Sequence, residues 1–201
     1  MGRQAAGEAF MRGFISHYGN AELDLLLHTP KETNQAQRFL STEYGVQNVN
    51  TAHLWGLHKL NNQTLYLPSP GIGEMAVHRA KYNERAFSLC GVTHTTATHR
   101  VQQTLADLPL DPVRPWDALI CTSSSVKQSV EIILEERMDY LRWKLGATRI
   151  ELPQLPVIPL GVHCSDYHNI DKNQARLALN IPPQDIVVIY VGRLSFHAKA
   201  H

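Results

Sequence analysis

Short apolar runs alternate with helix-patterned segments along most of this 201-residue chain. The clearest case is ALICT, residues 118–122, a run typical of a buried strand. A serine-rich turn follows it and can cap a long helix, whose apolar positions from Val126 to Leu145 recur at helical spacing until Gly146. This order of strand, cap and helix predicts a βα unit, and repeated βα units build parallel sheets because parallel strands need crossover connections.

The same alternation extends over the rest of the chain. Helices are expected over residues 4–18, from Thr29-Pro30 to Gly45, and over 73–82, 97–108 and 171–180. Strands are expected over 23–27, from 64 into the proline-broken loop ending at 70, over 87–92, and in the final apolar run 186–191. Residues 46–62 are ambiguous, and we expect a weak strand followed by a helical turn near 54–60. We therefore predict an α/β fold, a Rossmann-like parallel sheet with helices on both faces.

Composition excludes several classes of protein. Nineteen Lys and Arg against 18 Asp and Glu give a formal charge of +1 without a basic tract, so no nucleic-acid partner is expected. Cys90, Cys121 and Cys164 have no CxxC spacing, which indicates reduced thiols rather than a disulfide framework. There is neither a run of about 18 apolar residues nor a signal-peptide pattern. We expect a cytoplasmic protein without a transmembrane segment.

Ligands of open parallel sheets bind beyond the carboxyl ends of the strands, so the residues that follow the strands are the site candidates. One candidate is Gly71-x-Gly73-x-x-Ala76, which fits the loose dinucleotide-binding pattern. Its carboxylate about 20 residues later is absent, since Thr93 and His94 stand there. An NAD(P)- or flavin-dependent oxidoreductase using this loop is one alternative, and an ordinary loop-to-helix turn is the other.

Further candidates follow the other strands. His94 comes directly after 87–92, and with His99 it lacks the i, i+4 spacing of helical metal ligands, so no metal site is expected. Arg193 and Lys199 follow the last apolar run. An Arg fork and a mobile Lys at one strand end can hold a diphosphate and stabilise a departing negative charge, whereas a solvated surface pair is the simpler explanation.

Several segments together resemble a known enzyme family. PVIPLGVHCSDY (156–167), followed by VIYVGRLSFHAKAH (188–201), is similar to the interdomain linker and first donor-domain strand of the retaining GT-B glycosyltransferases of family 4. WDALICTSSSVKQSV resembles the last strand of that family's N-terminal domain, and GVTHT resembles its strand-end histidine. GRQAAGEAF resembles its first loop and helix.

The resemblance implies roles for individual residues. Arg193 and Lys199 would clamp the donor diphosphate, with Gly192 allowing close backbone approach. His94 would lie beside the transferred sugar, and Gly2 and Arg3 would belong to the first loop near the donor phosphates or the acceptor. The implied reaction moves a sugar from a nucleotide diphosphate sugar to an acceptor hydroxyl with retention of configuration, without a cofactor or metal.

The same resemblance predicts the domain organisation. Residues 1–160 would form the N-terminal acceptor-side domain without its first strand, and residues 161–201 the linker and truncated start of the nucleotide-sugar domain. The acceptor could be a carbohydrate, a lipid or a small molecule, and peripheral membrane association is left open. Because the cleft needs both domains, we expect this chain alone to be inactive and its last strand to lack a sheet. A non-catalytic remnant is the remaining alternative.

Overall fold

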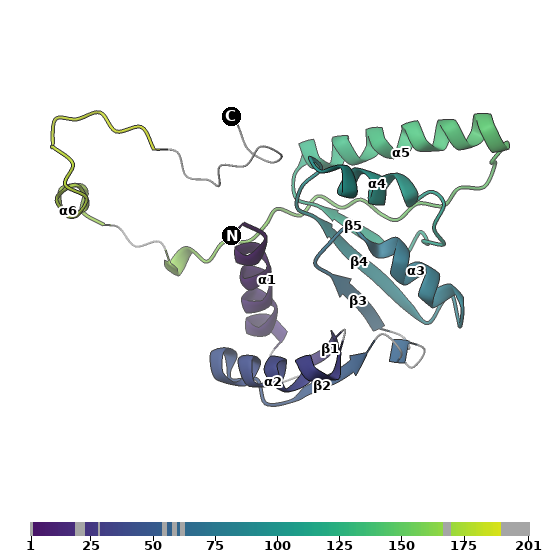
Figure 1. Ribbon diagram of the computed structural model, residues 1–201, viewed down its shortest axis with the longest axis horizontal. Coiled ribbons are helices and arrows are strands. Elements are labelled where there is room, and N and C mark those ends of the chain that lie inside the picture. Colours follow the sequence, from purple (N-terminus) through teal and green to yellow (C-terminus); the bar gives the residue numbers. More distant parts are fainter. Residues whose placement is uncertain are drawn as a thin grey trace.

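The computed structural model describes residues 2–18, 23–27, 29–53, 56–57, 60, 63–166 and 170–189 (Figure 1). Its helices are α1 (Gly2–Tyr18), α2 (Pro30–Tyr44), α3 (Ile72–Ala80), α4 (His99–Asp107), α5 (Ser124–Leu145) and α6 (Lys172–Ala178), with a 3-10 turn at Cys164–Asp166. Its strands are β1 (Leu23–Leu27), β2 (Val49–His53), β3 (Gln63–Leu67), β4 (Phe87–Thr93) and β5 (Ala118–Cys121). The expected alternation of helix and strand is confirmed, and the ambiguous region 46–62 contains β2.

The strands form two parallel sheets rather than the single sheet expected from the sequence. β1 pairs with β2, and β3, β4 and β5 pair in that order. The proline-rich segment after α5 runs alongside β5, with isolated parallel bridges from Ala118 to Gln154 and from Cys121 to Val157. The observed α/β arrangement is compatible with a Rossmann-like fold.

Helices cover both faces of the three-stranded sheet. Alternate strand residues such as Leu89 and Leu119 belong to a buried cluster that also contains side chains from α3, α4 and α5. On the opposite face, the Tyr66 ring of β3 stacks on Phe10 of α1 with ring centroids 4.1 Å apart. Right-handed crossovers explain this division, because strands that follow one another in a single direction place their connecting helices on one face.

The sequence signals for helix ends have direct counterparts in the backbone. The Ser123 hydroxyl accepts a hydrogen bond from the Val126 N–H at 3.2 Å and begins α5, and Gly146 ends the helix with a φ of 65°. Gly45 ends α2 in the same left-handed conformation, with a φ of 68°. These two glycines adopt the backbone that side chains with a Cβ disfavour, so they fix where their helices stop.

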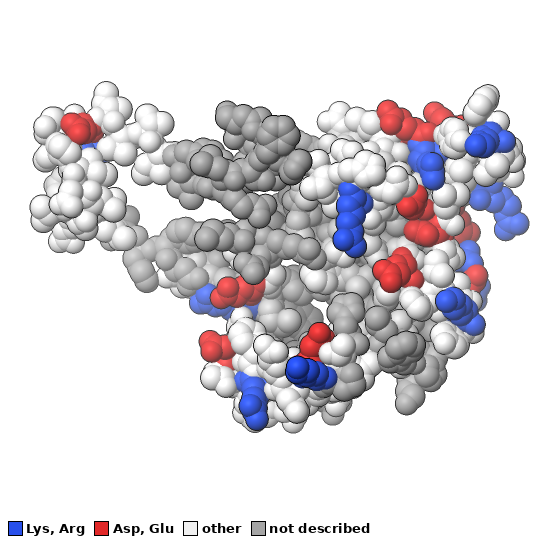
Figure 2. Space-filling view, in the orientation of Figure 1, with Lys and Arg blue, Asp and Glu red and all other residues white. Residues whose placement is uncertain are grey.

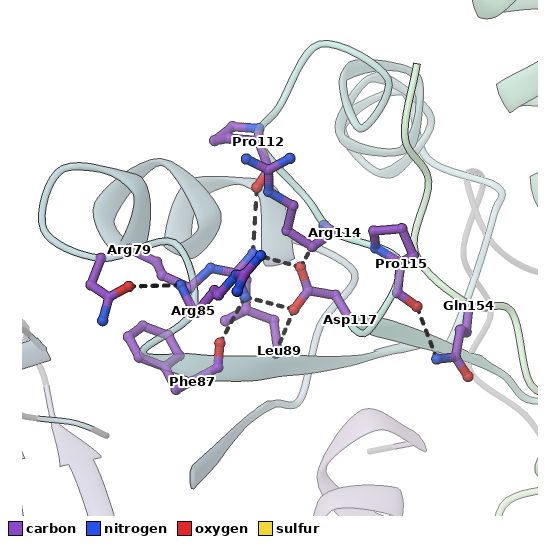
Figure 3. A network of polar contacts seen from close by, with 10 residues as sticks. Arg79, Arg85, Phe87, Leu89, Pro112, Arg114, Pro115, Asp117 and Gln154 are labelled. Atoms are coloured by element: carbon purple, nitrogen blue, oxygen red, sulfur yellow. Dashed lines mark hydrogen bonds and ion pairs between the residues drawn. The ribbon is translucent and has the colours of Figure 1, made fainter. Parts of the chain in front are cut away.

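A buried ion pair joins α3 to the sheet (Figure 3). Both carboxylate oxygens of Asp117 accept hydrogen bonds from the Arg79 guanidinium at 2.7 Å. The same carboxylate accepts hydrogen bonds from the backbone N–H groups of Leu89 at 2.9 Å and Arg114 at 2.8 Å. Arg79 also donates to the Phe87 carbonyl at 2.8 Å. The pair therefore connects α3, the beginning of β4 and the turn before β5.

The last described segment differs from the sequence expectation. Residues 185–189 form no strand, and Ile186 and Val188 are 95% and 92% exposed. A strand is stable only when its backbone groups pair with a neighbour, and no described strand lies alongside this run. The expected remainder of the run, residues 190–191, lies outside the described part of the chain.

Charged side chains are mixed over the surface seen in Figure 2, where acidic and basic groups lie next to one another. Specific surface pairs account for part of this mixing, such as Arg142 with Asp139 at 2.8 Å and Arg137 with Asp107 at 3.5 Å. In that view no patch of a single sign stands out, as the near-neutral net charge of the chain leads us to expect.

Candidate functional site

Two cavities meet at the carboxyl ends of β3 and β4. The first, of about 720 Å³, lies between the loops that follow these strands and one side of α4. The second, of about 730 Å³, lies between β1, β3 and α1. Five residues line both cavities: Pro68, Ser69, Gly71, Glu74 and His94.

The strand order explains why cavities form here. The strands β1 and β3 border the second cavity. The strand β2 lies on the far side of β1, and the strands β4 and β5 follow on the far side of β3, so the strand order runs in opposite directions away from the cavity. In open parallel sheets such a reversal leaves a crevice at the carboxyl ends of the strands, because the flanking loops diverge. His94, the residue directly after β4, lies at that point.

Close packing holds the β3–α3 loop against β4, next to His94. The Val92 N–H donates to the Ser69 carbonyl at 3.2 Å. Gly91 makes this approach possible, since a Cβ at that position would lie 2.8 Å from the Ser69 carbonyl oxygen and 2.6 Å from Ile72 Cγ2. Thr122 Oγ1 donates to the Thr93 carbonyl at 3.2 Å and ties the next loop to the same strand end. His94 therefore extends from a fixed backbone.

Charged side chains of both signs line the first cavity. Arg100 from the first turn of α4 lines it together with the carboxylates of Glu74, Asp107 and Asp111. Burial raises the pKa of the Asp111 carboxyl, and the neighbouring Asp107 charge raises it further. An imidazole, a guanidinium, carboxylates and threonine hydroxyls around one opening can form hydrogen bonds with a hydroxyl-rich ligand.

The glycine pattern at the start of α3 has a packing explanation. A Cβ on Gly73 would overlap the Asp111 carboxylate, so any larger residue here would have to displace that side chain. An acidic group at this position opposes the approach of a pyrophosphate, which a dinucleotide site places at the N-terminus of this helix. The turn does lie between a strand and a helix as the dinucleotide pattern requires, but its surroundings give that alternative no support.

The structure locates some of the sequence-predicted site residues. His94 lines both cavities. Gly2 and Arg3 lie in the first turn of α1 rather than in a loop before it, and the Arg3 side chain lies outside the described part of the structure. Gly192, Arg193 and Lys199 also lie outside the described residues, so the proposed diphosphate clamp stays a prediction.

Sequence reasoning missed Arg100 and Asp111 as residues of the pocket. Arg100 lies in the first turn of the helix after β4, and its position in a βα connection could have marked it. Asp111 follows α4 in an irregular segment, and no local pattern connects it with Gly73. The serine-rich turn after β5 caps α5 through Ser123, as its position before the helix predicts.

The described residues contain neither a metal-ligand cluster nor a helix that could span a membrane. Within residues 2–18, 23–27, 29–53 and the later described ranges, no three His, Cys, Asp or Glu side chains gather as metal ligands would. None of the described helices has the length and apolar character needed to cross a membrane. No protein-family model, curated protein or solved structure matches this chain.

Proposed function

We propose that this chain is the acceptor-side part of a retaining glycosyltransferase that uses a nucleotide diphosphate sugar. The observation that carries the proposal is the position of His94, directly after β4 and at the junction of two cavities. The resemblance of GVTHT to the strand-end histidine of GT-B family 4 enzymes predicts a polar opening at this place, and the mixed polar lining described above supports it.

Each group has a role in this proposal. The imidazole of His94 lies beside the transferred sugar and hydrogen-bonds its hydroxyls. Arg193 and Lys199 offset the negative charge that develops on the diphosphate as the bond between the diphosphate and the anomeric carbon of the sugar breaks. Gly192 lets the backbone approach the phosphates, and Gly2 and Arg3 border the donor or the acceptor. The acceptor oxygen bonds to the anomeric carbon on the face from which the nucleoside diphosphate leaves, and its proton passes to the departing phosphate oxygen, so configuration is retained.

Donor binding by the 201-residue chain tests the proposal. Ligand-observed NMR with UDP-, GDP- and ADP-sugars detects weak binding, and NAD(H) serves as the competing class of ligand. We expect weak binding of a nucleotide sugar that Arg193→Ala and Lys199→Ala each reduce, without transfer of the sugar. The exposed Arg142→Ala is a matched control, because Arg142 forms only a surface pair with Asp139.

The outcomes separate the alternatives. Preferential binding of NAD(H) that Gly73→Ala abolishes and Arg193→Ala leaves unchanged would establish the dinucleotide alternative instead. Failure of every nucleotide to bind would favour a non-catalytic remnant. Tight binding with unaided sugar transfer would support the chemistry but refute the expectation that this chain alone is inactive. Circular dichroism on each variant checks that it has folded.

A further inference from the structure

A cavity lies between the edge strands of the two sheets, and we call it the β1–β3 gap. Among the described residues, β1 pairs only with β2 on one edge, and β3 pairs only with β4 on one edge. All five residues of β1 and residues 64–67 of β3 line the same cavity of about 730 Å³. The second edges of both strands therefore border one space.

The two strands bordering this gap start at the same end of it. The Gln63 side chain, at the beginning of β3, donates to the Asp24 carboxylate near the beginning of β1 at 3.2 Å. At the other end, Pro68 and Ser69 after β3 line the cavity. One extended segment running in the same direction could pair with β1 on one side and with β3 on the other. The two sheets would then become one parallel sheet of six strands.

The lining of the gap sets the chemistry of its occupant. Besides the leucines of β1 and β3, the apolar side chains around it are Phe10, Met11, Phe14 and Met75. A strand in this position would be covered on its faces and paired on both edges. Strands of that kind in parallel sheets are nearly continuous runs of β-branched and other apolar residues.

Among the described residues, one exposed run has that composition. Residues 186–189 are Ile-Val-Val-Ile, all β-branched, and two of them are more than 90% exposed. The run forms no strand, and in Figure 1 the segment 170–189 stands away from both sheets. An unpaired gap and an unpaired apolar run of similar length thus occur in the same molecule.

We propose that residues 186–189 of one copy insert as a parallel strand into the β1–β3 gap of a second copy. Reciprocal exchange fills both gaps and gives a closed two-fold dimer, whereas one-way exchange would leave one run exposed. A second copy is the occupant that the structure favours, because the arm that carries the run stands apart from its own gap. The inference concerns the 201-residue chain and does not rest on the glycosyltransferase proposal.

The oligomeric state as a function of concentration tests the exchange. By light scattering after gel filtration we expect a dimer that dissociates on dilution. Val188→Lys should raise its dissociation constant at least about tenfold, because a Lys would be buried in the apolar gap. Leu177→Lys is the matched control, since Leu177 is an exposed apolar residue of α6 in the same arm and should leave the constant unchanged.

Hydrogen exchange of the backbone amides provides the second measurement. In the dimer we expect slow exchange of residues 186–189, and fast exchange in the Val188→Lys protein. A monomer at every concentration overturns the proposal. So does a dimer that Val188→Lys leaves intact, or one in which these amides exchange fast. Slow exchange of residues 186–189 in a monomer would mean that the run fills its own gap, which overturns exchange between copies.

Discussion

Replacing Asp117 with Asn should be among the most destabilising single substitutions in this chain. Asp117 and Arg79 are 0% and 1% exposed, so the Arg79 charge has no access to water. An Asn side chain keeps the volume but has only one acceptor oxygen. It therefore cannot serve both nitrogens of the Arg79 guanidinium and the two backbone N–H groups that the carboxylate now satisfies.

The size of the effect follows from the loss of one partner of a buried pair, which costs about 3–5 kcal/mol in the free energy of unfolding. Because whole domains are stable by only about 5–15 kcal/mol, this is a large fraction of the total. With a urea m-value of about 2 kcal/mol per molar, the unfolding midpoint should fall by about 1.5–2.5 M. A urea titration monitored by far-ultraviolet circular dichroism measures this shift of the midpoint.

The exposed pair Arg142–Asp139 is the control for this substitution. Its ion pair is 2.8 Å long, but the two side chains are 55% and 75% exposed. Asp139→Asn should therefore cost less than about 1 kcal/mol. If Asp117→Asn and Asp139→Asn lower the free energy of unfolding equally, the buried pair does not hold α3 to the sheet as we argue.

Three further predictions test local packing and electrostatics. Gly91→Ala should destabilise the fold by about 1–3 kcal/mol in the same titration, because its Cβ meets the Ser69 carbonyl and Ile72, whereas Gly13→Ala in the open interior of α1 should not destabilise it. Iodoacetamide should label the exposed Cys164 first and Cys121 last by mass spectrometry, since Cys121 is buried and burial raises its pKa; equal rates would contradict this. Asp111→Asn should raise the free energy of unfolding at pH 7, because the raised pKa means that the folded state disfavours the charged carboxyl. That gain should shrink as pH falls through the raised pKa and be lost below about 4, where the carboxyl is protonated in both states, and an unchanged gain would refute the assignment.

Local sequence signals were enough to locate most helices and strands. Ser123 and Gly146 bound α5 through contacts with residues three to five positions away, so their effect can be predicted without the fold. The strands β4 and β5 are short, apolar and enclosed by helices, and their spacing predicted parallel pairing. His94 was a site candidate for the same reason, because the carboxyl end of a parallel strand can be recognised in the sequence.

Contacts between distant residues could not be predicted in this way. Arg79 and Asp117 are 38 residues apart and lie in segments with unrelated patterns. The partner of Gly73 is Asp111, which changes the meaning of the glycine pattern from a phosphate loop to a packing contact. Arg100 joins the cavity beside His94 because the loop after β4 brings the first turn of α4 to the same opening.

The sequence by itself determined the type and order of the elements, because helix periodicity, caps and β-branched runs act over a few residues. The tertiary structure decided whether each element found a partner. Residues 186–189 have the composition of a buried strand and yet remain exposed, since strand formation requires a neighbouring backbone. The gap between β1 and β3 arises for the same reason, because pairing across a sheet depends on which segments meet in space.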